Sequence, residues 1–300
     1  MKAELIVNLT AGGGKPNHHL TTVLEYLKKN GLNYKVCITS RQGEAVELAQ
    51  KAADNGVESI VSVGGDGTVN EIVNGIMKSK YSPALGIIPL GWTNDFIKST
   101  GIPSDIIEAC KTLIKGKTKK IDVGLINNQI YFANICGIGF DAEVAYLANQ
   151  LKNRHPNWNT LSAYVYVFAT IKKLLSPFSY HNVKIKIDGQ ETQSKILFMA
   201  VGNGKIYGGG FKITPEAILD DGFLEVCTVE ELGRLKYLIS IPKVFKGTHK
   251  SIKGINFYRA KEVVIQSSEP ILAQVSGEVI EGQKEFTITL LPKSLKLIVP

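Results

Sequence analysis

The sequence predicts an α/β domain with a parallel sheet at the N-terminus, followed by an all-β, sandwich-like domain that carries a helical insertion. In the first third, continuous apolar segments alternate with helical ones, which is typical of a sheet covered by helices on both faces. After about residue 117, alternating apolar and polar residues between short Gly/Asn turns indicate antiparallel strands. The 300 residues suit two domains, predicted at 1–126 with 295–300, and at 127–294.

Four apolar segments, each followed by a helical pattern, predict the first domain. The strands are predicted at LIVNL (5–9), YKVCIT (34–39), ESIVSV (58–63) and ALGIIPL (84–90). The helices are predicted at HLTTVLEYLKKN (19–30), EAVELAQKAADNG (44–56), TVNEIVNGIMKS (68–79) and IIEACKTLIKG (106–116). We expect the last strand of the chain, LKLIV (295–299), to return to this domain.

The second domain is predicted from short strands around one helical stretch at 139–175. The predicted strands are KKIDVGLIN (119–127), IYFANICG (130–137), VKIKID (183–188), ETQSKILFMAVGN (191–203), FLEVCTV (223–229), NFYRAKEVVIQSS (256–268), ILAQVSG (271–277) and EFTITLLP (285–292).

The composition favours a soluble, cytoplasmic protein with an anionic partner. The net charge of +8 favours nucleotides, nucleic acid or acidic lipid headgroups. No nucleic-acid-binding motif accompanies the charge, so nucleic acid is not expected. No secretory signal is visible, and the longest apolar stretch, 161–171, is shorter than the roughly 20 residues that span a bilayer. The four scattered cysteines are expected to be free thiols.

The segment GGDGT (64–68) follows a predicted strand and opens a predicted helix. Amides and the helix dipole at such a position favour phosphate, although the GK[ST] of a P-loop is missing. Asp66 beside a phosphate requires a cation between them. A magnesium-bound nucleotide is the simplest such species, because Mg²⁺ binds one or two carboxylates plus phosphate oxygens. The alternative is a tight turn in which Asp66 caps the helix.

The other strand ends of the first domain agree with a ligand site. The first strand runs into NLTAGGGK (8–15), the second ends at Thr39 in TSRQGEA, and the fourth runs into PLGWTNDF (89–96). All of these loops follow the carboxyl ends of parallel strands, where open α/β sheets bind their ligands. Together they predict a nucleotide site.

Three segments of the second domain have both simple and functional interpretations. GIGFDA (137–142) imitates a dinucleotide fingerprint but lacks the βαβ context, so we interpret it as a tight strand-to-helix turn. DDGFLEV (220–226) is either a solvated turn or a hard-cation site. Glu278 in SGEV (276–279) is either a surface hairpin residue or a general base for a hydroxyl.

An apolar helix face in the insertion also has two interpretations. Its members are Leu161, Tyr164, Val165, Phe168, Ile171 and Leu175, with Lys172 and Lys173 adjacent. Core packing is one explanation. The other is contact with a lipid substrate or a membrane surface, which Trp158 and the tyrosines favour.

Taken together, these motifs resemble the bacterial diacylglycerol kinase catalytic-domain family, soluble lipid kinases related to sphingosine kinases. GGDGTxNE together with GGGFKxTPxAxLDDG is specific to that family, whereas GGDG alone also fits the related NAD kinases and phosphofructokinases. The resemblance covers nearly the whole chain, through NLTAGGGK, TSRQGEA, VGGDGTVNEIVNGI, PLGWTNDF, KKIDVG, YFANICGIGFDAEV, VGNGKIYGGGFKITPEAILDDGFLEV and VSGEV.

The resemblance implies ATP and Mg²⁺ at an NAD kinase/phosphofructokinase-like first domain, and phosphorylation of a lipid hydroxyl in a cleft against the second. It implies a catalytic Mg²⁺ network of Asp66, Asp95 and Asp122. It further implies a structural Mg²⁺ at Asp221 with carbonyls near Ile218 and Phe223, and Glu278 as the general base. The nucleotide-binding positions that it implies are Asn8, Leu9, Thr10, Ala11, Gly12, Thr39, Gly64, Gly65, Asp66, Gly67, Thr68, Val69, Asn70, Glu71, Trp92 and Asn94.

Three positions depart from the family pattern. Trp92 stands at the threonine of G-T-x-N-D, where a hydroxyl contact to the nucleotide is lost. Ser276 stands at the aspartate of D-G-E, next to the expected base. The first loop reads NLT where NPT is common.

We therefore expect phosphoryl transfer from ATP to a lipid hydroxyl, with diacylglycerol as the leading acceptor. A soluble-substrate kinase of the NAD kinase type and a non-catalytic nucleotide or lipid sensor are the alternatives. Ceramide, sphingosine, undecaprenol and phosphatidylglycerol stay open as acceptors. We expect peripheral contact with the membrane surface, and the oligomeric state, a homodimer included, stays open.

Overall fold

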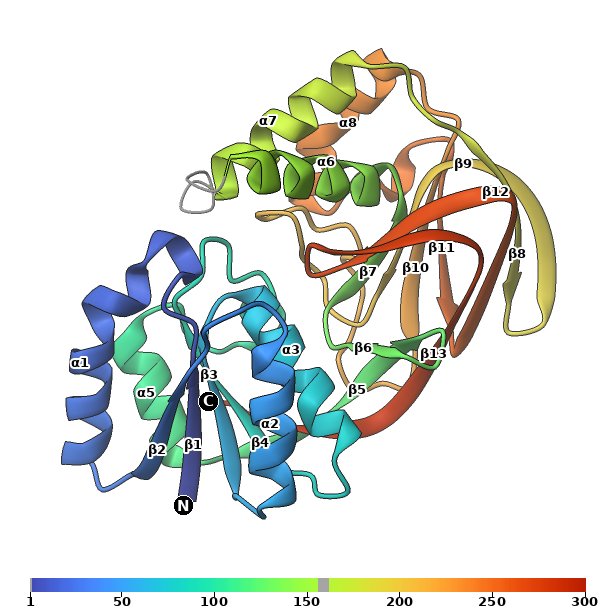
Figure 1. Cartoon of the computed structure of the whole chain (residues 1–300). Helices are drawn as coiled ribbons and strands as arrows, with labels where there is room; N and C mark the ends of the chain where they lie inside the picture. Colours follow the sequence, from blue (N-terminus) through green and yellow to red (C-terminus); the bar gives the residue numbers. More distant parts are fainter. Residues whose placement is uncertain (1, 156–161) are drawn as a thin grey trace. The chain divides into compact units, whose positions relative to one another are not determined.

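The chain divides into two compact units in a computed structural model that describes residues 2–155 and 162–300 (Figure 1). Unit 1 comprises Met1–Val123 and Pro292–Pro300, and unit 2 comprises Gly124–Leu291. Unit 1 is an α/β domain and unit 2 is rich in β-strands, which confirms the predicted fold class at this level.

The sheet of unit 1 has the strand order β13-β4-β3-β1-β2, and its four N-terminal strands pair in parallel. The end of β13 joins this sheet, because Lys296 and Leu297 pair in parallel with Ala84 and Leu85. The strands are β1 (Lys2–Val7), β2 (Asn33–Ile38), β3 (Ser59–Gly64), β4 (Ala84–Pro89) and β13 (Glu278–Ile298).

Helices cover both faces of this sheet. Figure 1 shows α1 and α5 on one side and α2 and α3 on the other, and each pair packs together. Because both faces are covered, β3 and β4 are buried at every residue. The helices are α1 (Lys15–Lys29), α2 (Glu44–Asp54), α3 (Asp66–Lys78), α4 (Ile97–Thr100), α5 (Ile106–Lys115) and the short 3-10 helix η1 (Ala11–Gly13).

Unit 2 is built on two long strands, β9 and β12, each of which pairs with three neighbours, β7 and β8 being common to both. One half of each pairs antiparallel with β8, and the other half with β7. The sheet extends from β9 to β10 and β11, and from β12 to β13. The strands are β5 (Thr118–Ile126), β6 (Ile130–Phe132), β7 (Ile135–Gly139), β8 (His181–Ile187), β9 (Gln190–Gly202), β10 (Leu224–Glu230), β11 (Ile255–Ala260) and β12 (Glu262–Val275).

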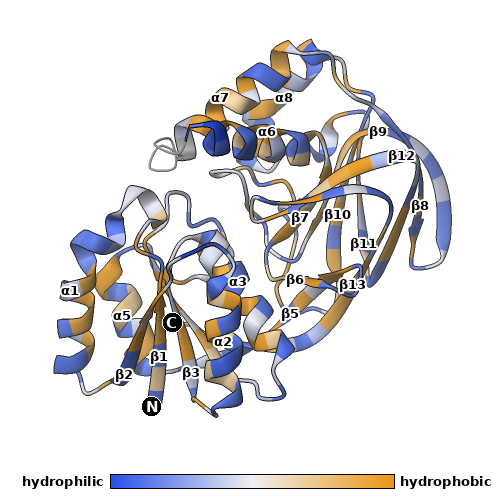
Figure 2. Ribbon diagram, viewed as in Figure 1, coloured by the Kyte–Doolittle hydropathy of each residue, from blue (hydrophilic) through white to orange (hydrophobic). Residues whose placement is uncertain are grey.

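Two apolar clusters lie on opposite faces of the central strands of unit 2. Met199, Val201 and Val226 face a cluster made of strand residues. Ala200 and Cys227, one position along, face a cluster that helices cover, because successive strand residues point to opposite faces. Figure 2 shows apolar colouring concentrated along the strands in both units. The helices of unit 2 are α6 (Phe140–Arg154), α7 (Ser162–Leu175), α8 (Arg234–Lys246) and the 3-10 helix η3 (His249–Ser251).

Several predicted elements of unit 2 differ in the structure. The predicted strand 130–137 is divided between β6 and β7, the predicted strand 271–277 is part of β12, and the predicted strands 285–292 and 295–299 are parts of the single strand β13. Helix α8 was not predicted, because Pro242 lies inside it and its apolar residues are not confined to one stripe. The predicted strand 256–268 is divided between β11 and β12 at Lys261. There the Asp188 carboxylate accepts hydrogen bonds from the amides of Lys261 and Glu262, which turns the chain.

Candidate active site

The N-terminus of α3 is the centre of the candidate phosphate site. β3 ends at Gly64, Gly65 is the extended N-cap residue, and α3 begins at Asp66. Within the described residues, no side chain caps this end of the helix. The first amides of a helix have no partner inside it, so with the helix dipole they favour an anion. Because Gly65 is the N-cap residue and no described side chain caps α3, the alternative in which Asp66 caps this helix is wrong.

Asp66 instead joins the loop after β3 to the loop after β4. One carboxylate oxygen accepts from the Thr93 hydroxyl (2.9 Å) and the Asp95 amide (3.0 Å), and the other accepts from the Phe96 amide (3.0 Å). Burial raises the pKa of Asp66 and the Asp95 charge adds to this rise, while the two amides act against it. Thr93 was not among the predicted site residues, because it fills the variable position of G-T-x-N-D.

Glycines allow the loops after β1, β3 and β4 to meet at the level of the backbone. A β-carbon on Gly91 would lie 2.4 Å from the Cα of Gly65. One on Gly12, whose φ is +58°, would lie 2.3 Å from the carbonyl oxygen of Leu90. No other residue fits at these two positions without moving the loops, so the glycines are required for the close approach.

The first loop is held by Asn8. Its side-chain amide donates to the Thr68 hydroxyl of α3 (3.2 Å), and its carbonyl accepts from the amide (3.1 Å) and the hydroxyl (2.8 Å) of Thr10. Leu9 and Ala11 follow in the same loop. Thr39, at the end of β2, donates its amide to the Val7 carbonyl (2.9 Å). These contacts bring the predicted nucleotide-binding positions of three loops to one edge of the sheet of unit 1.

Glu71, the last residue of the GGDGTVNE segment, holds a neighbouring loop. Its carboxylate accepts from the amides of Gly43 and Ala45, each at 3.1 Å, at the start of α2. Val69 and Asn70, between Glu71 and the phosphate loop, are buried. These contacts show that Glu71 holds the 39–45 loop next to α3.

Trp92 lies at the surface and is 43% exposed. The Lys15 ammonium sits 5.4 Å from the centre of its ring and donates to the Gly91 carbonyl (3.3 Å). Both residues line a cavity of about 460 Å³ that also includes His19 and Asn94. The indole that replaces the family threonine thus forms one wall of a cationic, partly apolar cavity in unit 1.

Of the three carboxylate residues expected to hold a catalytic Mg²⁺, Asp66 and Asp95 are joined by a hydrogen bond. The Asp95 amide donates to Asp66, and the buried Asp95 carboxylate pairs with Lys98 at 2.7 Å. Asp122, which is fully buried, accepts from the Lys293 amide at 2.6 Å. Among the described residues, no group of three His, Cys, Asp or Glu side chains is gathered to hold a metal ion. Asp66 and Asp95 nevertheless supply the oxygen donors that Mg²⁺ prefers, and phosphate oxygens commonly complete its coordination; at Asp95 the ion would replace the Lys98 ammonium.

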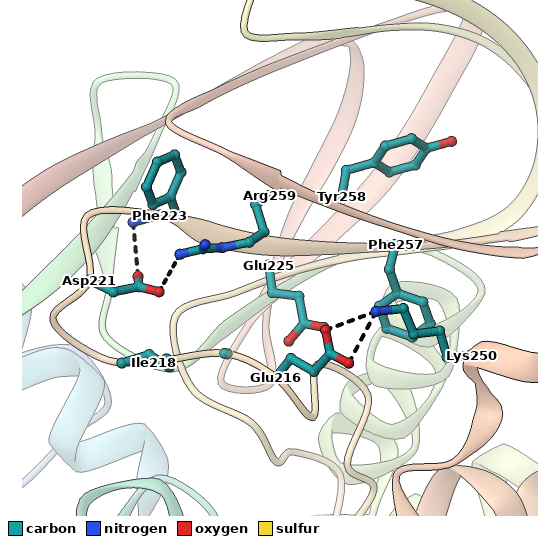
Figure 3. Close-up of a pocket in the computed structure, with 10 residues that line it drawn as sticks. Glu216, Ile218, Asp221, Phe223, Glu225, Lys250, Phe257, Tyr258 and Arg259 are labelled. Carbon is teal, nitrogen blue, oxygen red and sulfur yellow. Dashed lines mark hydrogen bonds and ion pairs between the residues drawn. The ribbon is translucent and has the colours of Figure 1, made fainter.

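Asp221, the expected ligand of a second cation, is paired with an arginine (Figure 3). The Arg259 guanidinium of β11 donates to one Asp221 oxygen, and the Phe223 amide donates to the other at 3.1 Å. Arg259 also stacks 4.3 Å above the Phe223 ring. With these side chains in place, a cation at Asp221 would face the guanidinium, so the residues do not fit a Mg²⁺ ion there. Arg259 was missed because it lies 38 positions along the chain from Asp221.

Asp221, Arg259 and Glu225 line one pocket, which measures about 150 Å³. The Glu225 residue is 5% exposed. Neither of its carboxylate oxygens makes a hydrogen bond among the described residues. Its neighbour Glu216 pairs with Lys250 at 2.9 Å. Burial raises the pKa of Glu225 to about 7, and the nearby amides of Glu216 and Ala217 only partly offset that rise.

Glu278, the expected general base, is the first residue of β13 and is half-buried. It follows a two-residue turn, Ser276-Gly277, in which both φ angles are positive (+51° and +85°). It pairs with Val275 across the hairpin. The turn geometry suits Gly, Asn or Asp better than serine, so Ser276 places a modest strain immediately before Glu278.

The predicted apolar helix face divides in the structure. Val165 of α7 is buried, whereas Tyr164, Phe168, Ile171 and Leu175 are exposed. Leu161 and Trp158 lie outside the described residues. Helix α8 also exposes large apolar side chains, namely Leu235, Leu238, Ile239 and Phe245. In the described part of the chain, no helix is both long enough and apolar enough to cross a membrane.

The fold and the candidate phosphate site of unit 1 are typical of enzymes that use nucleotides, and comparisons with known proteins identify the family. Residues 2–126 match the diacylglycerol kinase catalytic domain, and residues 134–299 match the YegS C-terminal NAD kinase beta sandwich-like domain. The chain is 31% identical to the diacylglycerol kinase of Bacillus subtilis over 92% of its own length and 89% of that protein. It is 32% identical to the diacylglycerol kinase of Staphylococcus carnosus, with 92% and 88% covered.

Solved structures agree with these relatives. The crystal structure of a diacylglycerol kinase from Bacillus anthracis superposes with a TM-score of 0.77 at 28% identity, over 100% of this chain and 97% of that one. The chain belongs to the diacylglycerol kinase family. This confirms the resemblance drawn from the sequence and, with it, the expected class of lipid kinase.

Proposed function

We propose that this protein transfers the γ-phosphate of ATP to the hydroxyl of a membrane lipid, with diacylglycerol as the acceptor and phosphatidic acid as the product. The observation that carries the proposal is the N-terminus of α3. No described side chain caps it, and Gly12, Gly65 and Gly91 allow three loops to meet around it. Residues 1–126 with 295–300 are proposed as the nucleotide-binding domain. Residues 127–294 are proposed as a β-sandwich lipid-substrate domain with a helical insertion.

In this proposal the amides at the start of α3 bind the ATP phosphates, because their donors point outward and the helix dipole favours negative charge. Asp66 and Asp95, with Asp122, would hold Mg²⁺, which when bound neutralises charge on the phosphates. Asp66 has a further role that its hydrogen bonds support. It fixes the 89–96 loop to the 64–68 loop, so the nucleotide-binding surface is preorganised.

Glu278 is proposed as the general base that accepts the proton of the lipid hydroxyl as that oxygen attacks the γ-phosphorus. Phosphoryl transfer depends mainly on positioning and electrostatics, so the base needs a defined orientation more than an unusual basicity. The turn before Glu278 supports this role, because a tight two-residue turn leaves its first strand residue little freedom.

The exposed apolar side chains of α7 and α8 are proposed to contact the cytoplasmic membrane surface, where a lipid substrate resides. Exposed lysines lie in the last turns of both helices, at Lys172 of α7 and at Lys243 and Lys246 of α8, whereas Lys173 of α7 pairs with Glu143. Apolar side chains rimmed by lysines are typical of segments that lie on an anionic bilayer. The protein would then be cytoplasmic and peripherally bound.

A lipid panel with γ-labelled ATP and Mg²⁺ tests the proposal. Diacylglycerol, ceramide, sphingosine, undecaprenol and phosphatidylglycerol are each presented in mixed micelles, and the lipid phase is counted for label. We expect label in the diacylglycerol sample above all others. Label in an NAD sample run alongside, counted in the aqueous phase, with none in any lipid, would overturn the proposal.

A further inference from the structure

Asp141 is a carboxylate outside the nucleotide loops with an unusual set of contacts. It lies in the first turn of α6, where it accepts from the Ala142 amide (2.9 Å), from the side-chain amide of Gln274 (3.0 Å) and from the Tyr207 hydroxyl. It therefore joins three segments of unit 2: α6 itself, the 203–223 loop through Tyr207, and β12 through Gln274. Burial raises the pKa of Asp141 to about 6.

The GIGFDA segment explains how the carboxylate fits there. A β-carbon on Gly137 would lie 1.9 Å from the Oδ2 atom of Asp141. Gly139, at φ +94°, would collide with the Leu197 carbonyl if it carried a side chain, at 2.7 Å. The interpretation of this segment as a tight strand-to-helix turn agrees with the structure, in which β7 ends and α6 begins there. The two glycines also make room for Asp141.

Gln274 transmits the contact from Asp141 to the turn before Glu278. Its amide nitrogen donates to Asp141, while its carbonyl oxygen accepts from the Gly277 amide at 2.9 Å. A side-chain amide has one donor end and one acceptor end. Because the carboxylate of Asp141 only accepts, the donor end of Gln274 must face Asp141. The acceptor end of Gln274 must then face the turn.

Two more contacts hold the same turn. The Asn149 side chain of α6 donates to the Gly277 carbonyl at 3.1 Å. On the other side, a β-carbon on Gly277 would lie 2.8 Å from the Tyr166 hydroxyl of α7. Both backbone polar groups of Gly277 are therefore used, and no space remains beside it. A turn held this firmly fixes the direction in which the next residue, Glu278, leaves it.

We propose that Asp141 and Gln274 are positioning residues that hold the Ser276-Gly277 turn, and through it the Glu278 carboxylate, in the orientation that proton transfer requires. The inference rests on the proposed function, because it assumes that Glu278 is the base. Neither residue touches the reacting atoms, so their effect is on kcat through geometry. A displacement of about 1 Å at a catalytic group can cost about 10²-fold in rate.

Exchanging the carboxylate at position 141 with the side-chain amide at position 274 tests this relay, the pair of hydrogen bonds that runs from Asp141 through Gln274 to the turn. Asp141→Asn places an amide donor against the amide donor of Gln274, and Gln274→Glu places a carboxylate against Asp141. Each single variant should lose about 10²-fold in kcat for lipid phosphorylation, with the KM for ATP unchanged because the ATP loops are in unit 1. In the double variant the new amide at 141 donates to one carboxylate oxygen at 274, and the other oxygen still accepts from the Gly277 amide. It should regain most of the lost kcat.

Melting temperature and Glu278→Gln complete the design. If the double variant regains its melting temperature but not its kcat, the contact is only structural and the inference is wrong. If Glu278→Gln is inactive while both single variants keep wild-type kcat, the inference fails and the proposed function stands. If Glu278→Gln is itself active, the assignment of the base fails, and the positioning role fails with it.

Folding of the single variants is the remaining requirement. Gln274→Met removes the relay while leaving Asp141 hydrogen-bonded to Tyr207 and Ala142, so it is the milder variant if Asp141→Asn does not fold. Loss of kcat at unchanged KM for ATP in folded Gln274→Met supports the relay. A wild-type kcat there overturns it.

Discussion

The phosphate loops of unit 1 and the Glu278 turn of unit 2 are each stabilised by a different kind of contact. In unit 1 the loops meet through glycine backbones and through amides that donate to Asp66. In unit 2 the turn is held by the side chains of Gln274 and Asn149, with Asp141 behind Gln274. The phosphate loops of unit 1 therefore depend on glycines where the backbones meet and on the Asp66 carboxylate, whereas the turn in unit 2 depends on matched side-chain donors and acceptors. Substitutions should affect the two regions differently.

The largest effect is expected at the glycine contact of unit 1. Gly91→Ala places a β-carbon 2.4 Å from the Gly65 Cα, so the two loops must separate. We expect loss of measurable Mg-ATP binding by calorimetry and a decrease of about 1–3 kcal/mol in the free energy of unfolding. Gly233→Ala is the matched control, because nothing lies within 4 Å of its β-carbon. Normal ATP binding by Gly91→Ala would contradict the role of the contact.

A carboxylate in unit 2 should make stability depend on pH. Burial raises the folded-state pKa of Glu225 to about 7, above its ordinary 4.5, so the fold favours the protonated form. The free energy of unfolding should therefore rise, by up to about 3 kcal/mol, as the pH falls from 8 to 5. Glu225→Gln should be more stable than wild type at pH 8 and should lack this increment.

Urea unfolding at both pH values measures the difference. Glu281→Gln, at an exposed position of β13, is the control and should keep the pH dependence of the wild type. An identical pH dependence in wild type and Glu225→Gln would show that Glu225 is not the group responsible.

The proposed membrane surface allows a comparison between the units at equal exposure. Ile171 of α7 and Ile38 of unit 1 are 52% and 51% exposed. Ile171→Ser combined with Phe168→Ser should weaken binding to anionic vesicles about 30-fold, since each side chain loses roughly 1 kcal/mol of apolar burial in the bilayer. Ile38→Ser should not change binding. Equal effects at both sites in a flotation assay would remove α7 from the proposal.

The smallest effect is expected at Asp221. Because Arg259 already neutralises this carboxylate, Mg²⁺ should shift the melting temperatures of the wild type and of Asp221→Asn by the same amount relative to EDTA. Arg259→Gln should lose about 0.5–1 kcal/mol of stability and should become sensitive to Mg²⁺. A wild-type melting temperature that rises with Mg²⁺, and no longer does in Asp221→Asn, would instead establish a cation site.

The same contrast explains how far the sequence predicted the molecule. The strands and helices of unit 1 and the position of the phosphate loop were predictable, because apolar periodicity and GGDGT are local signals. The contacts of Thr93 with Asp66, of Arg259 with Asp221 and of Gln274 with Asp141 were not. Their partners lie 27, 38 and 133 positions apart, and only the tertiary fold brings them together. Helix α8 was missed because Pro242 interrupts its pattern.

The most direct test of the central claim compares wild type and Glu278→Gln in one set of measurements. Lipid phosphorylation is followed with γ-labelled ATP and diacylglycerol micelles, and Mg-ATP binding is measured by calorimetry on the same preparations. We expect Glu278→Gln to bind Mg-ATP as the wild type does and to lose at least about 10²-fold in kcat, which is the usual contribution of a general base. A near-normal kcat in Glu278→Gln would contradict the account.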